Sequence, residues 1–338
     1  MTTTPPDPAQ IEAKILPGMS PAAVAYRRAI PEKLAEAIRH GALAEQAIVQ
    51  VELMTTGITS IVYRLTTGQG RRLILKMVEG LEWLRAEAVA LDGWRDLGVK
   101  TPQVIGLGFL DVAETIPFLL LEYVAGQDLL AVLEAEPGPA TSILADMGAI
   151  LARMHGLKGR GVGPLVFTGP AYRGRFDTFQ QEMAATEFQT ALAVNLTQGR
   201  LQTADLATVE QAIALLSRHL ETIKPSLVHT DFRAGNILYQ PAAPIPYTII
   251  DPAPRLTHPY LCLSYSLILE EIHGRREAGP ILAGYRTIEA VDDRALTAAK
   301  LLQLVSLLSR WGDPQHPYAN NLAHLYRRTL TAYRAGSC

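Results

Sequence analysis

Residues 227–251 read LVHTDFRAGNILYQPAAPIPYTIID, and they bring a His-x-Asp, an Arg, an Asn and a second Asp into one short segment. Two apolar runs, 237–239 and 247–250, lie on either side of a Pro-rich turn. This pattern is typical of two short strands joined as a hairpin. The segment therefore predicts a hairpin with several polar side chains at its base.

The chemistry that suits this set of side chains is phosphoryl transfer. In kinases an Asp accepts the proton of the acceptor hydroxyl, an Asn five residues later binds a metal ion, and a second Asp beyond a hairpin binds metal and phosphates. Asp231, Asn236 and Asp251 occur in this order. Arg233 follows the candidate base by two residues, where a guanidinium can neutralise charge on the transferred group. His229 is expected to orient the loop through hydrogen bonds.

The segment also resembles the aminoglycoside phosphotransferase and choline kinase-like family of small-molecule kinases. The resemblance lies in His229-Thr230-Asp231 through Asn236, followed by Ile250-Asp251-Pro252. The His-Arg-Asp, Asp-Phe-Gly and Ala-Pro-Glu motifs of protein kinases do not occur in the chain. The resemblance covers about residues 48–265 and implies an α+β, bilobal protein-kinase-like fold. Its first lobe is a five-stranded antiparallel sheet plus a helix, and its second lobe is mainly helical.

Three regions are expected along the chain: an N-terminal extension with a helix (1–46), a nucleotide-binding lobe (47–124), and a lobe with the catalytic loop and acceptor-binding helices (125–338). Helical periodicity over residues 21–40 predicts one or two helices in the extension. Alternating apolar residues predict strands at 48–53, 60–65, 72–77, 104–107 and 118–122. Residues 156–175 are rich in Gly and Pro and predict a long loop.

A phosphate-binding Lys is expected on the third strand, as in the kinase template. Lys76 lies there on an otherwise apolar run, where a charged side chain is seldom buried without a partner. The resemblance implies that Glu87, on the following helix, holds its ammonium group, with Glu79 and Glu82 as alternatives. An edge Lys that faces solvent remains a second interpretation.

Two further segments are candidates for nucleotide binding. A turn between the first two strands supplies amides and hydroxyls that reach phosphates, and its Gly permits close backbone approach. The resemblance implies that the backbone of the segment between the lobes hydrogen-bonds adenine. The candidate residues are Thr55, Thr56, Gly57 and Ser60 in the turn, and Glu122, Tyr123 and Val124 between the lobes.

The acceptor site is expected among the helices of the second lobe. Candidate charges there are Asp177, Glu182, Glu187, Asp205, Glu270, Glu271, Asp313 and His316. The chain departs from the family after the metal-binding Asp, since His258 and Cys262 occupy two positions that are commonly acidic. Because of that departure, two questions stay open: whether carboxylates support the loops, and whether the protein is specific for aminoglycosides.

Composition narrows the possible partners. The formal net charge is −2 and there is no cluster of Lys or Arg, so neither nucleic acid nor a membrane surface is an expected partner. Two cysteines without metal-ligand spacing predict neither a disulfide framework nor a zinc site. A polar N-terminus and the lack of a long apolar run favour a cytoplasmic protein. Nothing in the sequence specifies an oligomeric state.

These features predict an enzyme that uses ATP or GTP with Mg²⁺. It would transfer the γ-phosphoryl group to a hydroxyl of a sugar, an amino alcohol or an aminoglycoside-like molecule, with Asp231 as base. Three alternatives stay open: an antibiotic-resistance aminoglycoside kinase, a nucleotide-binding pseudokinase that acts as a scaffold, and a different α+β fold with Lys76 on its surface.

Overall fold

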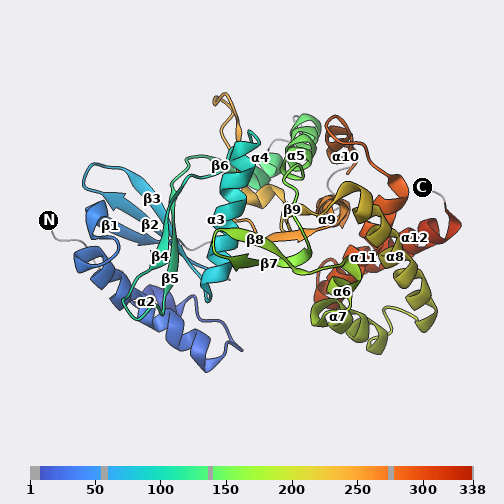
Figure 1. Ribbon diagram of the computed structural model, residues 1–338, viewed down its shortest axis with the longest axis horizontal. Helices are drawn as coiled ribbons and strands as arrows, with labels where there is room; N and C mark the ends of the chain where they lie inside the picture. The colour runs from blue at the N-terminus through green and yellow to red at the C-terminus, as the bar shows by residue number, and fades with distance from the viewer. Residues whose placement is uncertain (1–7, 55–59, 136–139, 273–277, 337–338) are drawn as a thin grey trace. The chain divides into compact units, whose positions relative to one another are not determined.

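The chain folds into two compact units (Figure 1). The computed structural model describes residues 8–54, 60–135, 140–272 and 278–336. The first unit comprises residues 1–95, 100–126 and 240–250, and the second comprises 96–99, 127–239 and 251–338. No helix among the described residues has the length and apolar character needed to cross a bilayer.

A five-stranded antiparallel sheet of order β1-β2-β3-β5-β4 forms the centre of the first unit, as the sequence predicts. Its strands are β1 (Ile48–Leu53), β2 (Ile61–Thr67), β3 (Arg72–Met77), β4 (Val104–Phe109) and β5 (Pro117–Glu122). A further short strand, β11 (Tyr247–Ile249), belongs to the same unit, where the Ile249 amide donates to the Lys100 carbonyl at 2.9 Å.

Both faces of this sheet are covered, because alternate residues of a strand point to opposite sides. On β3, Leu73, Leu75 and Met77 join one core cluster, while Ile74 packs against another. Helix α3 (Leu81–Asp96) covers the second face with Leu84, Ala88 and Leu91. Lys76 is an even-numbered residue of β3 and so belongs to the α3 face.

Helix α2 (Pro21–His40) covers the first face and is one continuous helix (Figure 1). Ser20 caps its N-terminus by accepting from the Ala23 amide at 3.1 Å. Its buried residues Ile30, Leu34, Ala37 and Ile38 belong to the same core cluster as the sheet. The Tyr26 hydroxyl donates to the Val78 carbonyl at 2.8 Å, directly after β3. The extension therefore supplies part of the core of the first unit, a role that its sequence does not indicate.

The second unit is mainly helical, as expected. Its helices are α4 (Leu129–Ala135), α5 (Ala140–Met154), α6 (Phe179–Met183), α7 (Thr186–Thr197), α8 (Leu206–Ile223), α9 (Pro259–Ile272), α10 (Gly279–Arg286), α11 (Asp293–Trp311) and α12 (Ala319–Ala335). Strand β10 (Ile237–Tyr239) pairs with β6 (Gln127–Asp128). A four-stranded sheet has the order β8-β7-β12-β9, where these strands are β8 (Ala171–Phe176), β7 (Val162–Thr168), β12 (Pro254–Thr257) and β9 (Ser226–His229).

The prediction of a long loop over residues 156–175 is wrong. Strands β7 (Val162–Thr168) and β8 (Ala171–Phe176) form an antiparallel hairpin there, and β7 also pairs with β12 (Pro254–Thr257). The glycines that suggested a loop permit close backbone contact instead. A Cβ on Gly174 would lie 2.3 Å from the Val162 nitrogen. A strand partner some ninety residues away cannot be inferred from local composition.

Candidate active site

Lys76 and Glu87 form a buried ion pair in the first unit. Lys76 Nζ donates to Glu87 Oε2 at 2.6 Å, and the two residues are 5% and 1% exposed. The pairing follows from the fold, since Lys76 faces α3 and Glu87 lies on the buried side of that helix. The surface interpretation of Lys76 is therefore wrong, because a solvent-facing Lys would not be buried.

The alternatives to Glu87 are placed elsewhere. Glu82 accepts a hydrogen bond from Arg85 at 3.1 Å on the exposed side of α3, and Glu79 is exposed. Of the predicted phosphate-binding turn, Thr55, Thr56 and Gly57 lie outside the described residues. Ser60 is described and is buried at the start of β2.

The segment after β5 contains the three candidate adenine-binding residues. The Tyr123 ring is covered by the Arg72 guanidinium, whose carbon lies 4.1 Å from the ring centroid. The amides of Glu122 and Tyr123 donate to the carbonyls of Gln103 and Arg72 at 2.9 and 3.4 Å. Val124 is half-buried. Two of the three amides are thus used to fix the segment within the first unit.

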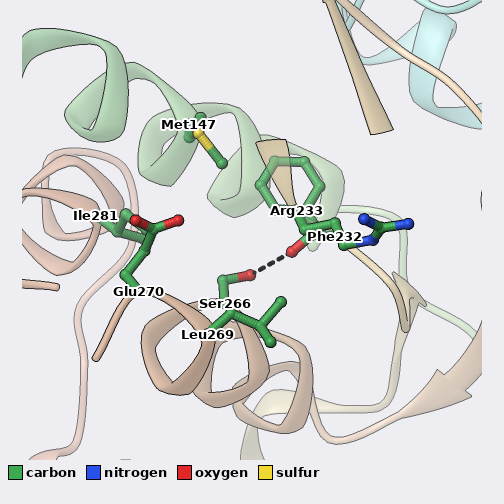
Figure 2. A pocket seen from close by; sticks show the side chains of 7 residues that line it. All are labelled: Met147, Phe232, Arg233, Ser266, Leu269, Glu270 and Ile281. Atoms are coloured by element: carbon green, nitrogen blue, oxygen red, sulfur yellow. Dashed lines mark hydrogen bonds between the residues drawn. The ribbon is translucent and has the colours of Figure 1, made fainter. Parts of the chain in front are cut away.

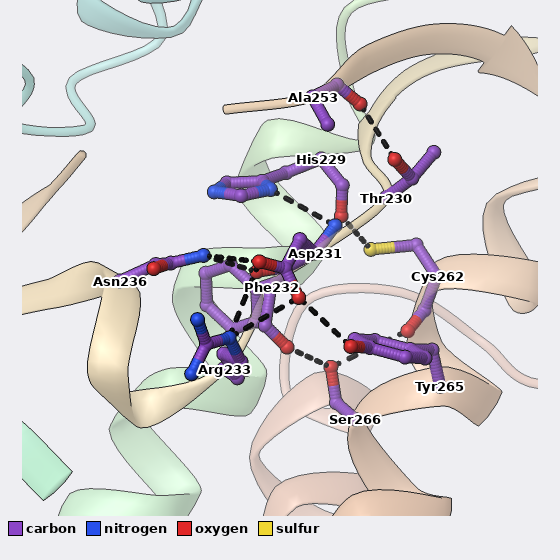
Figure 3. A network of polar contacts seen from close by, with 10 residues as sticks. All are labelled: His229, Thr230, Asp231, Phe232, Arg233, Asn236, Ala253, Cys262, Tyr265 and Ser266. Atoms are coloured by element: carbon purple, nitrogen blue, oxygen red, sulfur yellow. Dashed lines mark hydrogen bonds and ion pairs between the residues drawn. The ribbon is translucent and has the colours of Figure 1, made fainter. Parts of the chain in front are cut away.

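In the second unit, the loop between β9 (Ser226–His229) and the short 3-10 helix Ala234–Asn236 gathers three predicted residues (Figure 3). Asn236 Nδ2 donates to Asp231 Oδ2 and to the Asp231 carbonyl, both at 2.8 Å. Arg233 Nε lies 3.2 Å from each oxygen of the Asp231 carboxylate. Asp231 therefore has a fixed carboxylate in contact with a cation and an amide.

His229 is fully buried below this loop. Its Nδ1 accepts from the Asp231 amide at 3.2 Å, which requires that this nitrogen be unprotonated. Its ring stands edge-on to Phe232, with centroids 5.9 Å apart. The side chain thus fixes the backbone at Asp231 and keeps the loop tightly turned.

Asp251 lies at the start of the segment that returns to the loop. It is exposed and has a left-handed backbone, with φ of 52°, which is uncommon for a residue other than Gly. Two residues later, the Ala253 carbonyl accepts from the Thr230 amide at 3.1 Å and from the Thr230 hydroxyl at 2.8 Å. Pro254 then pairs with His229 in the sheet. The segment after Asp251 is therefore bonded to the residue that precedes Asp231.

The oxygen atoms that could act as metal ligands here suit a hard divalent cation. Because the amide nitrogen of Asn236 is used on Asp231, its oxygen points away from that carboxylate (Figure 3). An amide oxygen and a carboxylate are ligands that Mg²⁺ accepts, and this ion commonly takes one or two protein ligands together with substrate phosphates. Among the described residues, no group of three or more His, Cys, Asp or Glu side chains forms a self-sufficient metal site.

Helix α9 contacts the loop through neutral side chains, where the family resemblance would lead one to expect carboxylates. The Cys262 thiol donates to the His229 carbonyl at 2.8 Å, and burial raises the pKa of this thiol, which keeps its proton. The Ser266 hydroxyl donates to the Phe232 carbonyl at 2.9 Å. The Tyr265 hydroxyl donates to Asp231 Oδ1 at 2.8 Å (Figure 3). Neutral donors thus support the loop. Sequence analysis singled out the position of Cys262 but missed Tyr265 and Ser266, because hydroxyl side chains on a buried helix carry no distinctive signal.

The other changed position, His258, is also structural. It is fully buried at the end of β12, where its Nδ1 accepts from the Tyr260 amide at 3.2 Å. Its Nε2 therefore carries the proton and donates to His219 Nδ1 at 3.0 Å. Burial lowers the pKa of both histidines.

Most candidate acceptor charges have structural partners in the second unit. Glu182 is buried and accepts from Arg255 Nε at 2.5 Å and from Thr257 Oγ1 at 3.0 Å. Burial raises the pKa of Glu182, and Arg255 opposes that shift. The remaining pairs are Glu187 with Arg255, Asp177 with Arg173, Asp205 with Arg334, and Glu271 with Lys300 and Arg328. Asp313 accepts from the Gln315 amide, and His316 stacks on Trp311.

Glu270 differs from these residues by its position. It lies in a small cavity next to the catalytic loop, which Met147, Phe232, Arg233, Ser266, Leu269 and Ile281 also line (Figure 2). Glu270 is 8% exposed and comes from the same helix, α9, that holds the loop. Glu270 therefore shares this cavity with Arg233.

Comparison with known protein families shows which family the chain belongs to. Residues 51–253 match the model of the phosphotransferase enzyme family. The match spans both the Lys76–Glu87 pair and the catalytic loop and covers more than half of the chain. The chain therefore belongs to the phosphotransferase enzyme family, and it has the fold of small-molecule kinases. A comparison with curated proteins finds no match.

Solved structures of similar fold include small-molecule kinases. A putative fructosamine-3-kinase from Thermobifida fusca is 21% identical, with 88% of this chain and 98% of that chain covered and a TM-score of 0.57. Aminoglycoside phosphotransferase APH(4)-Ia is 16% identical over 90% of this chain and 100% of its own, with a TM-score of 0.57. Amicoumacin kinase hAmiN, in complex with AMP-PNP, Ca²⁺ and Ami, is 13% identical over 87% and 89%, with a TM-score of 0.51. These likenesses agree with the α+β, kinase-like fold expected from the sequence.

Proposed function

We propose that this phosphotransferase moves the γ-phosphoryl group of ATP or GTP to a hydroxyl group of a small molecule, with Asp231 as the catalytic base. The observation that carries the proposal is the loop in which Asp231 contacts both Arg233 and Asn236. A carboxylate, a cation and a metal-binding amide in this order are what the kinase reaction requires.

Each residue then has a defined task. Asp231 orients the acceptor hydroxyl and accepts its proton as the oxygen attacks the γ-phosphorus. The bond from that phosphorus to the β–γ bridging oxygen breaks, and the nucleoside diphosphate leaves. Arg233 turns from the carboxylate to the transferred group, where its charge stabilises the developing negative charge. Mg²⁺, when bound, neutralises the phosphates, and Asn236 and Asp251 are the residues that would hold it.

The first unit supplies the nucleotide-binding side chains. Lys76 binds the phosphates, and Glu87 keeps its ammonium group in place. Because the amides of Glu122 and Tyr123 are used internally, the Glu122 carbonyl and the Val124 amide are the groups we assign to the adenine edge. The turn that contains Thr55, Thr56 and Gly57 stays a prediction for phosphate binding, together with Ser60.

The acceptor is assigned by class only. APH(4)-Ia has been solved with AMP-PNP and hygromycin B, and hAmiN with AMP-PNP and Ca²⁺. For this chain we expect a sugar, an amino alcohol or an aminoglycoside-like molecule, and Glu270, which lines the same small cavity as Arg233, is the carboxylate we propose for contact with it. A screen of such hydroxyl compounds by ADP release identifies the class. Minimum inhibitory concentrations of aminoglycosides separate a resistance enzyme from a metabolic one.

Replacement of the base tests the proposal. Asp231→Ala is expected to lower turnover by at least about a thousandfold, because the proton acceptor is lost, and to leave the affinity for MgATP unchanged. The measurement is ADP release and transfer of labelled γ-phosphate, with calorimetry for binding. Asp177→Ala removes an exposed carboxylate of the same unit and serves as the matched control.

Two results would count against the proposal. Wild-type turnover in Asp231→Ala would remove Asp231 as the base. Binding of MgATP by the wild-type protein with no transfer to any acceptor, water included, would instead favour the pseudokinase scaffold.

A further inference from the structure

The carboxylate of Asp231 is held by three side chains, two from its own loop and one from α9. Asn236, at the end of the loop, donates to Oδ2 at 2.8 Å, and Tyr265, on α9, donates to Oδ1 at 2.8 Å. Arg233 Nε lies between the two oxygens, at 3.2 Å from each. The two oxygens therefore have different neutral partners, and rotation of the carboxylate would break both short hydrogen bonds.

Tyr265 is one of three side chains by which α9 contacts this loop. Cys262, Tyr265 and Ser266 are three and four residues apart, so they lie on one side of the helix. Cys262 and Ser266 donate to backbone carbonyls, whereas Tyr265 donates to the carboxylate itself (Figure 3). The first two contacts set the path of the loop, and the third sets the orientation of its functional group.

We propose that Tyr265 is a positioning residue for the phosphoryl-transfer step, whose hydroxyl fixes the Asp231 carboxylate in the rotation that receives the acceptor proton. This inference rests on the proposed function of Asp231. An oriented carboxylate needs no rearrangement when the acceptor hydroxyl arrives, and such preorganisation contributes to the rate of the chemical step.

The environment keeps Tyr265 as a hydrogen-bond donor. Burial and the neighbouring Asp231 charge raise the pKa of the Tyr265 hydroxyl, so it remains protonated wherever the enzyme is folded and active. The Tyr265 side chain is buried on α9, a helix whose residues are nearly all buried. A rigid support of this kind is what a positioning hydrogen bond requires.

Tyr265→Phe removes the hydroxyl and keeps the ring, so packing of α9 is preserved. We expect kcat to fall about tenfold, because a hydrogen bond to a charged group is lost, with KM for MgATP unchanged. MgATP is the probe, with ADP release to water, or to any acceptor found in the screen, as the readout.

The matched control is Tyr260→Phe, on the same helix. Its hydroxyl donates to the Ala290 carbonyl at 3.2 Å and accepts from the Asp292 amide at 3.0 Å, away from the catalytic loop. This variant is expected to keep the wild-type kcat. An equal effect of both variants would show a general loss of α9 stability and would overturn the assignment to Tyr265.

A second measurement does not depend on turnover. In protein labelled at the tyrosine ζ-carbon, the Tyr265 resonance is the one missing from Tyr265→Phe. It should shift in Asp231→Asn and stay in place in Asp177→Asn. No shift in Asp231→Asn would overturn the contact.

The two hypotheses fail in different ways. If Tyr265→Phe keeps wild-type turnover and Asp231→Ala is inactive, the positioning role of Tyr265 alone is refuted. An active Asp231→Ala removes the proposed base and the positioning role together.

Discussion

Lys76 shows how one residue's neighbours decide its chemistry. An ammonium group in a protein interior is unfavourable unless a counter-charge compensates for the lost hydration. Glu87 provides that charge at 2.6 Å, and both side chains are withdrawn from solvent. The pair is therefore rigid, and its ammonium group is placed by the sheet and by α3 together.

Glu87→Gln is expected to weaken binding of MgATP about tenfold, because the ammonium group of Lys76 is no longer held by a full opposite charge. Calorimetric titration with MgATP measures the change. Glu82→Gln, on the exposed side of the same helix, should bind as the wild type does. Equal binding by both variants would contradict the role of the pair.

At the scale of elements, α5 and α10 cross in direct backbone contact. A Cβ on Gly284 would lie 1.8 Å from the Ala145 carbonyl oxygen, and a Cβ on Gly148 would lie 1.9 Å from the Ile281 oxygen. No flexible side chain separates the helices at these points. This close crossing also fixes Met147 and Ile281, which line the cavity beside Arg233.

Gly284→Ala is expected to lower the free energy of unfolding by about 3 kcal/mol, because the helices must move apart. Urea denaturation followed by circular dichroism measures it. Gly279→Ala, in the same helix, adds a methyl group that meets nothing within 4 Å and should change stability by less than about 0.5 kcal/mol. Similar losses in both variants would contradict the packing argument.

At the scale of the whole molecule, three histidines of the second unit have lowered pKa values. Burial lowers the pKa of His155 to about 3, and His155 Nδ1 lies 2.9 Å from the Tyr285 hydroxyl. Burial also lowers the pKa of His219 and of His258. Between about pH 6.5 and 3 the unfolded chain therefore binds protons that the folded chain does not.

The contribution of these histidines to the free energy of unfolding should be fully present above about pH 6.5 and should fall as the pH is lowered. Each proton taken up only by the unfolded chain contributes about 1.4 kcal/mol per pH unit. His155→Gln should reduce the slope of the free energy of unfolding against pH, between pH 6 and 4, by the contribution of about one proton. Urea unfolding at several pH values measures this slope. His324→Gln, on the exposed side of α12, is the control. An unchanged slope in His155→Gln would show that His155 does not contribute.

Much of the fold and part of the candidate site could be predicted, because the signals were local. Strand periodicity placed five strands correctly, and the loop motif placed Asp231, Arg233 and Asn236 within six residues of one another. Lys76 could be singled out because a charged residue interrupts an apolar strand. Its partner required a choice among three glutamates, which the alternation of β3 and the buried side of α3 resolve.

The sequence alone was enough for the five strands of the first sheet, the loop motif and the family, since repeating patterns and short motifs depend on neighbours in the chain. Only the tertiary structure shows which polar groups that are far apart in the sequence come into contact. Tyr265 reaches Asp231 over 34 residues, and Arg255 reaches Glu182 over 73. Such contacts depend on how helices and strands pack, and packing is cooperative over the whole core. For that reason the supports of the catalytic loop and the partners of most acceptor-site carboxylates appeared only in three dimensions.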